Sequence, residues 1–566
     1  MSEELVGPSL HLVRNHGFKW YRHISEQWAV WAKGYIFDVG NTLHEKENLC
    51  EYFATADTES EFVRLLLAAN GSFAVVLYNR DFMLAAVDRL RSMPLFYTTG
   101  DGARLIGDDA DILASVIGDV APEETSLEEF ALTGFVVGRN TLHPQIKEIQ
   151  AGEYVRFERG NFIPAGYFRH LHSHDRCVTE EEHFTALADI SRRVAERLIS
   201  STHDRPIVLP LSGGYDSRYI ACMLKELNYK NVICYTYGRS DSDEVITSRQ
   251  VADALNYDWY FVEHTAAKVR DVFSGPQLEA FYNYCHNRSS APHNQEFIAL
   301  TELRSMGILP NDAIIVPGFC GDLLGGSYVP REFQLGYTNG VLKRGLVNYI
   351  ADKHFYARLF ANDVVTNAVR KHIQQVLDEI RAIPDTAETF TSYNEAFFTM
   401  HKVAKFVVNS LRIYEFFGME WRMPLWDQEL AGYWYSVPLN KRIGSSLYNR
   451  FLFENYFRPM NVAVYKKQVE GRAVKIQRLF RYLGIPYPFA SNIVLKASKL
   501  SNQFGGTRPH FNAHDEYEKF YTSQLYSANM PLTHMHQING IIARWWLWKK
   551  YGWMPALYPI RPVSES

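Results

Sequence analysis

The first part of the chain alternates short apolar runs with turn residues, a pattern typical of antiparallel sheets. Residues 72–78 and 83–87 are two such runs with a polar turn between them. A later pair, residues 152–157 and 161–163, is separated by an Arg-Gly turn. The pattern predicts a compact antiparallel domain over residues 1–170.

From residue 205 onwards, short apolar strands alternate with amphipathic helices, after a helix predicted at 179–200. The predicted strands are 207–211, 232–237, 259–262 and 313–316, and the predicted helices are 218–227, 244–255 and 296–306. Such alternation with short loops indicates an α/β domain with a doubly wound parallel sheet. Beyond residue 329 the pattern is mostly helical. We therefore expect a second domain over 180–566, with a helical insertion at about 330–395 and helical C-terminal additions.

Composition narrows the functional classes. The chain has 566 residues, of which 47% are apolar, which predicts two to four globular domains. The net charge of −4 shows no excess of basic residues, so we do not expect a nucleic-acid partner. No apolar run reaches 18 residues, and the aromatic patch 545–548 is too short for a bilayer. Since no signal peptide is visible either, the expected location is the cytoplasm, without a membrane partner.

Cysteines and histidines give weak signals for metal or disulfide chemistry. The six cysteines contain no CxxC pair; they are Cys50, Cys177, Cys222, Cys234, Cys285 and Cys320. Neither a zinc site nor a disulfide framework is expected. His170, His172 and His174 alternate, and on a strand they would share one face and bind a metal. A linker with solvated histidines explains them equally well.

The strongest chemical signal is a Ser-Gly-Gly-Tyr-Asp-Ser string at residues 212–217, where a predicted strand ends and a helix begins. Glycines let the backbone approach an anion, and the helix start offers N–H groups and a positive dipole end. Asp216 would repel a bare phosphate, so its presence calls for Mg²⁺. A serine-capped glycine turn is the alternative, but the full string favours phosphate binding. The chain has no Walker-type GxxxxGK[ST] string.

This string resembles the pyrophosphate-binding motif of the asparagine synthetase family and its N-type ATP pyrophosphatase relatives. Residues 235–252 look like the family's next strand and helix. Residues 318–326, Gly-Phe-Cys-Gly-Asp-Leu-Leu-Gly-Gly, are similar to its second signature, and residues 418–427 to its Gly-x-Glu-Ala-Arg-x-Pro-Phe-x-Asp segment. Residues 462–467 fall where the family carries an essential lysine. The four segments follow in the family's order, which makes the resemblance specific.

The N-terminal part resembles the family's glutaminase-fold (Ntn-type) domain, at residues 70–74, 88–97 and 143–152. Altogether the resemblance covers about residues 35–470. Glutamine-hydrolysing members begin Met-Cys-Gly and use that cysteine as a nucleophile, whereas this sequence begins Met-Ser-Glu. We therefore expect a degenerate domain without glutaminase activity, although Ser2 is an alternative nucleophile.

The second signature also departs from the family pattern. Phe319 stands in place of the family's Glu, or of the Tyr of β-lactam synthetases, and Gly321 and Leu323 replace Ser and Glu. A group that takes part in proton transfer is thereby lost, which argues against aspartate as the substrate. The departures point to a specialised branch, like β-lactam synthetases, lasso-peptide cyclases and homologues in surface-polysaccharide clusters.

The resemblance implies an ATP-dependent ligase that adenylates a carboxylate, releases pyrophosphate and forms an amide. The residues expected to bind pyrophosphate are Ser212, Gly213, Gly214, Asp216, Ser217 and Gly318. Asp216 and Asp322 would hold Mg²⁺. Lys467 would act as a cation near the α-phosphate, unless it is only one of a surface pair with Lys466. Glu420 would be the base for the amine, unless it forms a structural ion pair with Arg422.

The expected partners are a small-molecule, sugar or peptide carboxylate and an amine donor, and we allow for a homodimer. Three other functions compete with this interpretation. The first is a glutamine-hydrolysing asparagine synthase. The second is a thiolating or tRNA-modifying pyrophosphatase, which the acidic balance disfavours. The third is a non-catalytic scaffold that kept the fold, which the intact anion and metal groups disfavour.

Overall fold

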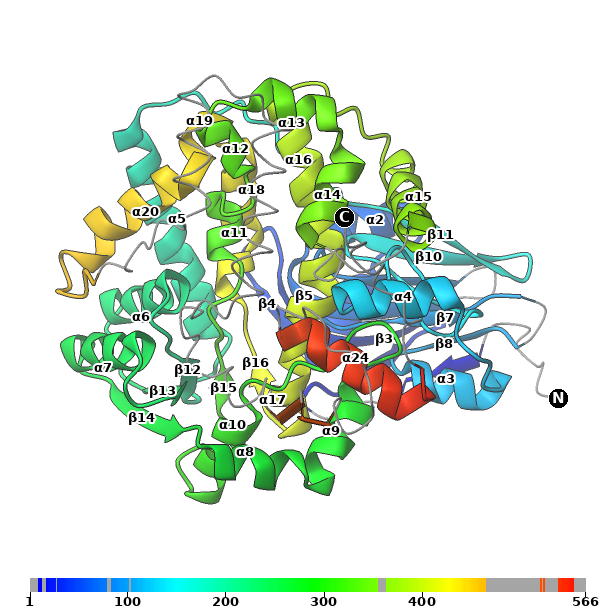
Figure 1. Cartoon of the computed structure of the whole chain (residues 1–566), viewed down its shortest axis with the longest axis horizontal. Helices are drawn as coiled ribbons and strands as arrows, with labels where there is room; N and C mark the ends of the chain where they lie inside the picture. The colour runs from blue at the N-terminus through cyan, green and yellow to red at the C-terminus, as the bar shows by residue number, and fades with distance from the viewer. Residues whose placement is uncertain are drawn as a thin grey trace, which may run out of the picture.

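The computed structural model describes most of the chain, and every structural statement below concerns those residues. They are residues 9–12, 17–26, 28–78, 83–100, 103–354, 363–464, 520–521, 523–524 and 538–553. Lys467 and Ser2 lie outside the described residues. In Figure 1 the antiparallel N-terminal strands lie on one side of the molecule and the parallel sheet lies on the other.

The N-terminal part contains a seven-stranded antiparallel sheet with two helices on one face. In order across the sheet the strands are β11 (Asn161–Gly166), β10 (Glu153–Glu158), β6 (Met83–Val87), β5 (Asn70–Tyr78), β3 (Ala29–Phe37) and β2 (Tyr21–Ile24), with β4 (Leu43–Glu45) paired to β3. Phe73, Val75 and Leu77 of β5 pack against the helices α1 (Lys46–Ala54) and α2 (Glu59–Ala68). The alternate residues of β5 face the other side of the sheet. They are also buried, because a second layer of the structure covers that side. Burial on both faces explains the continuous apolar run that predicted this strand.

A smaller sheet completes the N-terminal part. Its strand order is β1 (Ser9–His11), β8 (Leu105–Gly107), β7 (Phe96–Thr98) and β9 (Ile146–Glu148). The helices α3 (Ala110–Ile117) and α4 (Glu124–Thr133) follow in the chain. The C-terminal helix α24 (Ile538–Tyr551) returns to α4, where Trp546 stacks on Phe130 with the ring centroids 5.2 Å apart. In Figure 1 this last helix, in red, lies across the N-terminal half.

The second part is built on a five-stranded sheet in which all pairs are parallel. Its order is β14 (Asp258–Glu263), β13 (Val232–Gly238), β12 (Ile207–Pro210), β15 (Ile314–Ile315) and β16 (Glu420–Trp421). The helices between the first strands are α6 (Tyr215–Glu226) and α7 (Asp243–Leu255), after α5 (Glu180–Ser200). The predicted α/β fold class, an antiparallel domain followed by a parallel-sheet domain, is therefore confirmed. Strands β13 and β14, which follow β12 in the chain, lie on one side of it, and β15 and β16 lie on its other side. A topological switch point therefore lies between β12 and β15.

The two parts share one apolar core. Val76 of β5 and Val208 of β12 belong to the same buried cluster, which continues between the two sheets. Buried ions cross this core: Arg91 pairs with Glu148 at 2.7 Å, and Lys405 of the π-helix Thr399–Val407 also contacts Glu148. Because an unpaired buried charge is costly, the Lys405–Glu148 pair ties the two parts together.

The histidine segment between the two parts is neither a metal site nor a solvated linker. His170 is buried and contacts the Tyr435 hydroxyl and the Arg89 carbonyl. His172 contacts Glu395 and Arg442, while His174 contacts the Val437 carbonyl. The three rings thus serve three different sets of partners. Among the described residues, no group of three or more His, Cys, Asp or Glu side chains is arranged to hold a metal ion.

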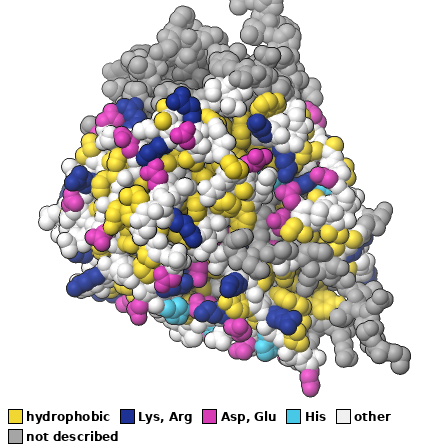
Figure 2. Space-filling model, turned by 90° about the horizontal axis from the view of Figure 1, so that it is seen from below, with side chains coloured by type: hydrophobic (Ala, Val, Ile, Leu, Met, Phe, Trp, Pro, Cys, Tyr) yellow, Lys and Arg dark blue, Asp and Glu magenta, His cyan; other side chains and the backbone are white. Residues whose placement is uncertain are grey.

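After residue 329 the described chain is mainly helical, as predicted, except for the two-residue strand β16, which the helical pattern did not indicate. No helix in the described ranges has the length and apolar character needed to span a bilayer. Figure 2 shows one face of the molecule, on which basic and acidic side chains are interspersed among apolar ones.

Candidate functional site

The Ser-Gly-Gly-Tyr-Asp-Ser string follows the carboxyl end of β12 and ends in the first turn of α6, which begins at Tyr215. The Ser212 hydroxyl accepts a 3.1 Å hydrogen bond from the Gly214 N–H and lies 3.2 Å from the Ser217 hydroxyl. The Ser217 hydroxyl in turn accepts from the Ser212 N–H at 3.2 Å. The two serines therefore hold the loop in a tight turn. The first N–H groups of α6 have no helical carbonyl to bond, as at any helix start, which suits them to an anion.

The second signature packs directly on this loop. A Cβ atom added at Gly318 would lie 2.5 Å from the backbone nitrogen of Ser217 and 2.8 Å from its Cα. Real Cβ atoms do not approach backbone so closely, so only glycine allows this contact. Gly318 thus belongs to the candidate site because it lets the two loops touch across the switch point.

The two aspartates predicted to bind a metal meet at this contact. The Asp322 backbone N–H donates a 3.1 Å hydrogen bond to Oδ2 of Asp216. Asp322 is exposed in the first turn of the short helix α11 (Gly321–Gly325), and Asp216 is half-buried in the first turn of α6. Both carboxylates therefore lie beside the loop.

A third side chain, Tyr448, completes this group and gave no signal in the sequence. It lies on α20 (Ser446–Leu452), is buried, and donates a 2.8 Å hydrogen bond from its hydroxyl to Oδ1 of Asp216. Burial raises the pKa of this phenol well above its ordinary value. The hydroxyl therefore stays protonated and remains a donor to the carboxylate.

Arg218 connects the loop to the segment that precedes the predicted lysine. This fully buried arginine of α6 donates to the Gly213 carbonyl at 3.2 Å, and to the carbonyls of Val462 and Val464 at 3.0 and 2.7 Å. The described chain thus reaches the loop at residue 464. Lys467 itself lies outside the described residues.

Glu420 occupies the opposite edge of the sheet. It pairs with Ile314 at the start of β15, and Ile314 is in register with Ile207 at the start of β12. Its carboxylate accepts from Arg205 at 2.8 and 3.1 Å and from Arg422 at 3.1 Å. The pKa of Glu420 is lowered by these two arginines, against the effect of burial. This geometry favours the structural ion pair and not the role of a base at the loop.

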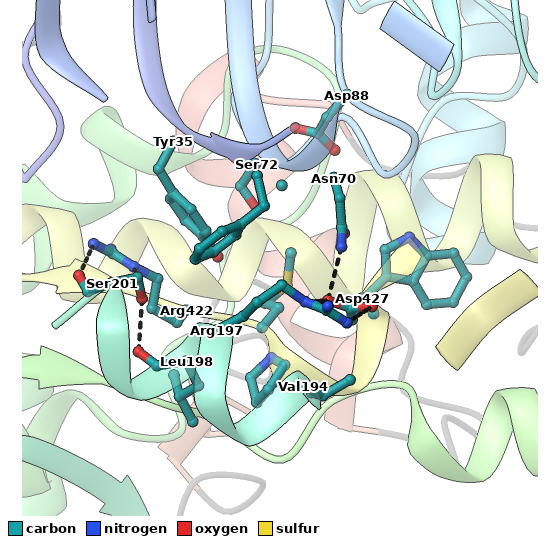
Figure 3. Close-up of a pocket in the computed structure, with 15 residues that line it drawn as sticks. Tyr35, Asn70, Ser72, Asp88, Val194, Arg197, Leu198, Ser201, Arg422 and Asp427 are labelled. Carbon is teal, nitrogen blue, oxygen red and sulfur yellow. Dashed lines mark hydrogen bonds and ion pairs between the residues drawn. The ribbon is translucent and has the colours of Figure 1, made fainter. Parts of the chain in front are cut away.

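A partly open cavity of about 40 Å³ lies between the two parts of the chain. Figure 3 shows Tyr35, Ser72 and Asp88 of the N-terminal part above residues of α5 and the segment 422–427. Arg197 of α5 holds Asp427 at 2.8 Å, and Asn70 donates to the same carboxylate at 2.9 Å. The cavity has room for a few water molecules only. It is therefore not a nucleotide site.

Comparisons with known proteins agree with the two-part architecture. A family model described as asparagine synthase matches residues 188–452, and a glutamine amidotransferase domain model matches residues 48–168. Together the two matches span more than half of the chain. The first match includes both aspartates and the loop and ends before Lys467. A comparison with curated proteins found no match.

Two solved structures show a distant likeness. One is a glutamine phosphoribosylpyrophosphate amidotransferase from B. subtilis complexed with ADP and GMP, which is 11% identical over 44% of this chain and 73% of that chain, with a TM-score of 0.21. The other is described as the allosteric regulatory enzyme of purine biosynthesis, which is 10% identical over 53% of this chain, with a TM-score of 0.19. The match spans only 56% of the second structure's own length.

Proposed function

Because the chain belongs to the asparagine synthetase family, we propose that it adenylates a substrate carboxylate with ATP, releases pyrophosphate and transfers the acyl group to an amine. The observation that carries this proposal is the hydrogen bond between the Asp322 N–H and Asp216. It brings two carboxylates, a glycine-rich loop and a helix start together at the switch point of a parallel sheet. Ligands of such sheets bind at this edge.

The donor set fits Mg²⁺. This ion prefers oxygen ligands and is commonly held by one or two protein carboxylates together with substrate phosphates. Asp216 and Asp322 would hold it, and the hydrogen bonds of Asp216 to Tyr448 and to the Asp322 N–H orient its carboxylate. When bound, the ion would neutralise charge on the phosphates of ATP.

The residues of the chain would assist the first step by stabilising the leaving group. A carboxylate oxygen of the substrate attacks the α-phosphorus of ATP, and the bond to the bridging oxygen of the β-phosphate breaks. The negative charge of the departing pyrophosphate develops beside the N–H groups of residues 213–217 and the start of α6. Ser212 and Ser217 can exchange their mutual hydrogen bond for bonds to phosphate oxygens. Lys467 is proposed as the cation at the α-phosphate.

We further propose that glutamine is not the nitrogen source. Cys50 is the one cysteine that the sequence places in residues 1–170. It lies on the buried face of α1, and burial raises the pKa of its thiol to about 12. A thiol in this environment is neither ionised nor accessible, so it does not serve as a nucleophile. The amine would then come from ammonia or from an amine substrate.

The carboxylate is proposed to differ from aspartate, because Phe319 supplies neither an acid nor a phenol at the second signature. A small-molecule, sugar or peptide carboxylate remains the substrate class. The glutamine-hydrolysing asparagine synthase is the second candidate, since a glutamine amidotransferase domain model matches the N-terminal part.

The test is ATP–pyrophosphate exchange with purified protein and Mg²⁺, over a panel of L-aspartate, the other amino acids, uronic acids and short peptides. We expect exchange with a carboxylate other than aspartate, with AMP and pyrophosphate as the products. ADP and phosphate as the products with an accepted carboxylate would overturn the adenylation mechanism. Exchange with L-aspartate, together with glutamate release from glutamine, would favour the asparagine synthase. A lack of both ATP binding and exchange would favour the non-catalytic scaffold.

A further inference from the structure

Glu296 lies at the same edge of the parallel sheet as the phosphate loop. It immediately precedes α10 (Phe297–Ser305), which leads into β15. A helix that joins two parallel strands runs back across the sheet, so its first turn lies at the carboxyl edge. Glu296 is half-buried there and is not fully enclosed in the core. It is therefore an acid at the ligand-binding edge that the proposed first step does not use.

Two tyrosines fix the position of this carboxylate. The Tyr235 hydroxyl of β13 donates to one oxygen, and the Tyr414 hydroxyl of α17 (Arg412–Phe416) lies 3.0 Å from both. The carbonyl of Tyr235 also accepts a 2.8 Å hydrogen bond from the N–H of Leu211, the residue before Ser212. Tyr235 thus links Glu296, through its side chain, to Leu211 at the start of the loop, through its backbone.

The surroundings of Glu296 differ from those of several other buried acids. Glu420, Glu395 and Glu415 are each held by an arginine. Among the described residues no Lys, Arg or His lies within ion-pair distance of Glu296, whose partners are two phenols. Burial raises the pKa of Glu296 to about 7, although both phenols favour the ionised form and act against that rise. A carboxyl group with such a pKa exchanges protons readily near neutral pH.

Asn294, two residues before Glu296 in the chain, is a further buried polar residue. Asn294 is fully buried, and its side-chain nitrogen donates to the hydroxyls of Tyr282 and Tyr521. Its Oδ1 atom has no hydrogen-bond partner among the described residues. The Asn294 amide is thus held in the core by the two tyrosine hydroxyls.

We propose that Glu296 is the base that accepts a proton from the amine nucleophile in the second step. The inference rests on the proposed function. Glu296 would supply the proton acceptor for this step. Phe319 provides none at the second signature, and Glu420 is held by two arginines at the opposite edge of the sheet. Tyr235 and Tyr414 would be positioning residues, because they act on the carboxylate and not on the substrate.

The step balances as follows. The amine binds as the free base, and its nitrogen attacks the carbonyl carbon of the acyl-adenylate. The C–N bond forms, the C–O bond to the phosphate breaks, and AMP leaves with the bonding electron pair. The proton that the nitrogen loses passes to the ionised carboxylate of Glu296, and the amide is released. Glu296 then returns the proton to solvent.

The experiment separates the two steps in Glu296→Gln. The carboxylate is the one that supports ATP–pyrophosphate exchange in the wild type, and the amine probe is ammonium chloride. We expect exchange within about twofold of the wild type and amide formation reduced about 100-fold or more. Glu302→Gln is the matched control, since Glu302 lies on the same helix and pairs with Lys268 at the surface. Both of its rates should stay at the wild-type level.

A second variant tests the positioning role and does not depend on whether Glu296→Gln folds. Tyr414→Phe removes a donor to the carboxylate, so the pKa of Glu296 should rise. The pH at which amide formation reaches half its maximum should shift upward, while the pH profile of exchange stays in place. A structural role alone would move neither profile.

Several outcomes would overturn the inference. One is amide formation at the wild-type rate in Glu296→Gln, and another is an equal loss of both steps. A wild type that exchanges pyrophosphate but forms no amide with ammonium would also contradict it, as would an unshifted profile in Tyr414→Phe. Absence of exchange in the wild type would instead overturn the proposed function itself, and the role of Glu296 with it.

Discussion

The hydroxyl group of Tyr448 donates a 2.8 Å hydrogen bond to Oδ1 of Asp216, although the two residues are 232 positions apart in the chain. Tyr448 is held in place by the glycines of the neighbouring signature, since a Cβ at Gly325 would lie 2.6 Å from its ring. The other oxygen of Asp216 accepts from the Asp322 N–H. Helix α20 therefore sets the orientation of a proposed metal ligand.

Removing this hydroxyl should weaken nucleotide binding. A hydrogen bond to a charged group contributes about 1.5–3 kcal/mol, so Tyr448→Phe should bind ATP in the presence of Mg²⁺ about tenfold more weakly or worse. Isothermal titration calorimetry measures this directly. Tyr219→Phe is the control, because the hydroxyl of Tyr219 is buried nearby and contacts Ser191. Equal losses in the two variants would show that the hydrogen bond to Asp216 has no special effect.

ATP binding should depend on Mg²⁺ through Asp216. Asp216→Asn removes the charge but keeps a side-chain oxygen that accepts from Tyr448 or from the Asp322 N–H, so the fold should persist. We expect the wild type to bind ATP far more tightly with Mg²⁺ than with EDTA, and this difference should largely disappear in the variant. Calorimetry in both buffers gives the comparison. Equal affinity of the wild type in the two buffers would contradict the metal assignment.

Lys467 should act mainly in the transition state. If it stabilises charge at the α-phosphate, Lys467→Ala should change the Kd for ATP by less than about threefold and lower kcat by about 100-fold or more. Lys466→Ala is the matched control and should leave both quantities near the wild-type values. Similar losses in the two variants would favour a surface pair of lysines.

Glu420 should contribute to stability and not to catalysis. Glu420→Gln removes the charge that Arg205 and Arg422 share, at a site that is only partly screened by solvent. We expect a loss of about 1–3 kcal/mol in the free energy of unfolding, seen as a lower Tm, with kcat almost unchanged. Differential scanning calorimetry and a turnover assay test both parts. A large fall in kcat without a change in Tm would restore its role as a base.

Stability should fall in acid because of the buried group formed by His172, Glu395 and Arg442. Burial lowers the pKa of His172 from 6.5 to about 4, so the unfolded chain takes up a proton that the folded chain does not, and stability decreases as the pH falls from 6.5 to 4. Arg442 is the main cause that lowers the pKa of Glu395 from 4.5 to about 2, against the effect of burial. Its stabilisation is complete above pH 4.5 and is lost as the pH falls towards 2.

Thermal unfolding at a series of pH values measures this dependence. His172→Gln keeps a polar side chain but cannot titrate, so its Tm should depend less on pH between 6.5 and 4. His203→Gln, at an exposed position, serves as the control. If the slope of Tm against pH in His172→Gln equals that of the wild type, another group dominates the acid response.

The sequence alone determined the fold class and singled out residues 212–217 as a candidate anion-binding loop. Both follow from local patterns: the period of apolar residues changes from that of antiparallel strands to that of alternating strands and helices, and the loop string occupies six consecutive residues. Asp322 also followed from its signature. The extent of the N-terminal core could be anticipated because β5 is apolar on both of its faces.

The tertiary structure decided which acids lie together. Glu420 stands in a segment that resembles a family motif, but parallel pairing with β15 places it at the amino edge, between two arginines that the sequence does not bring near it. Tyr448 and Glu296 carry no local pattern, since the position of each depends on packing between helices and strands far apart in the chain. Burial is decided in the same way: His172 lies in a polar stretch, yet its side chain is buried against Glu395 and Arg442. A sequence records local periodicity and short strings, whereas distances and burial arise only when distant segments pack against one another.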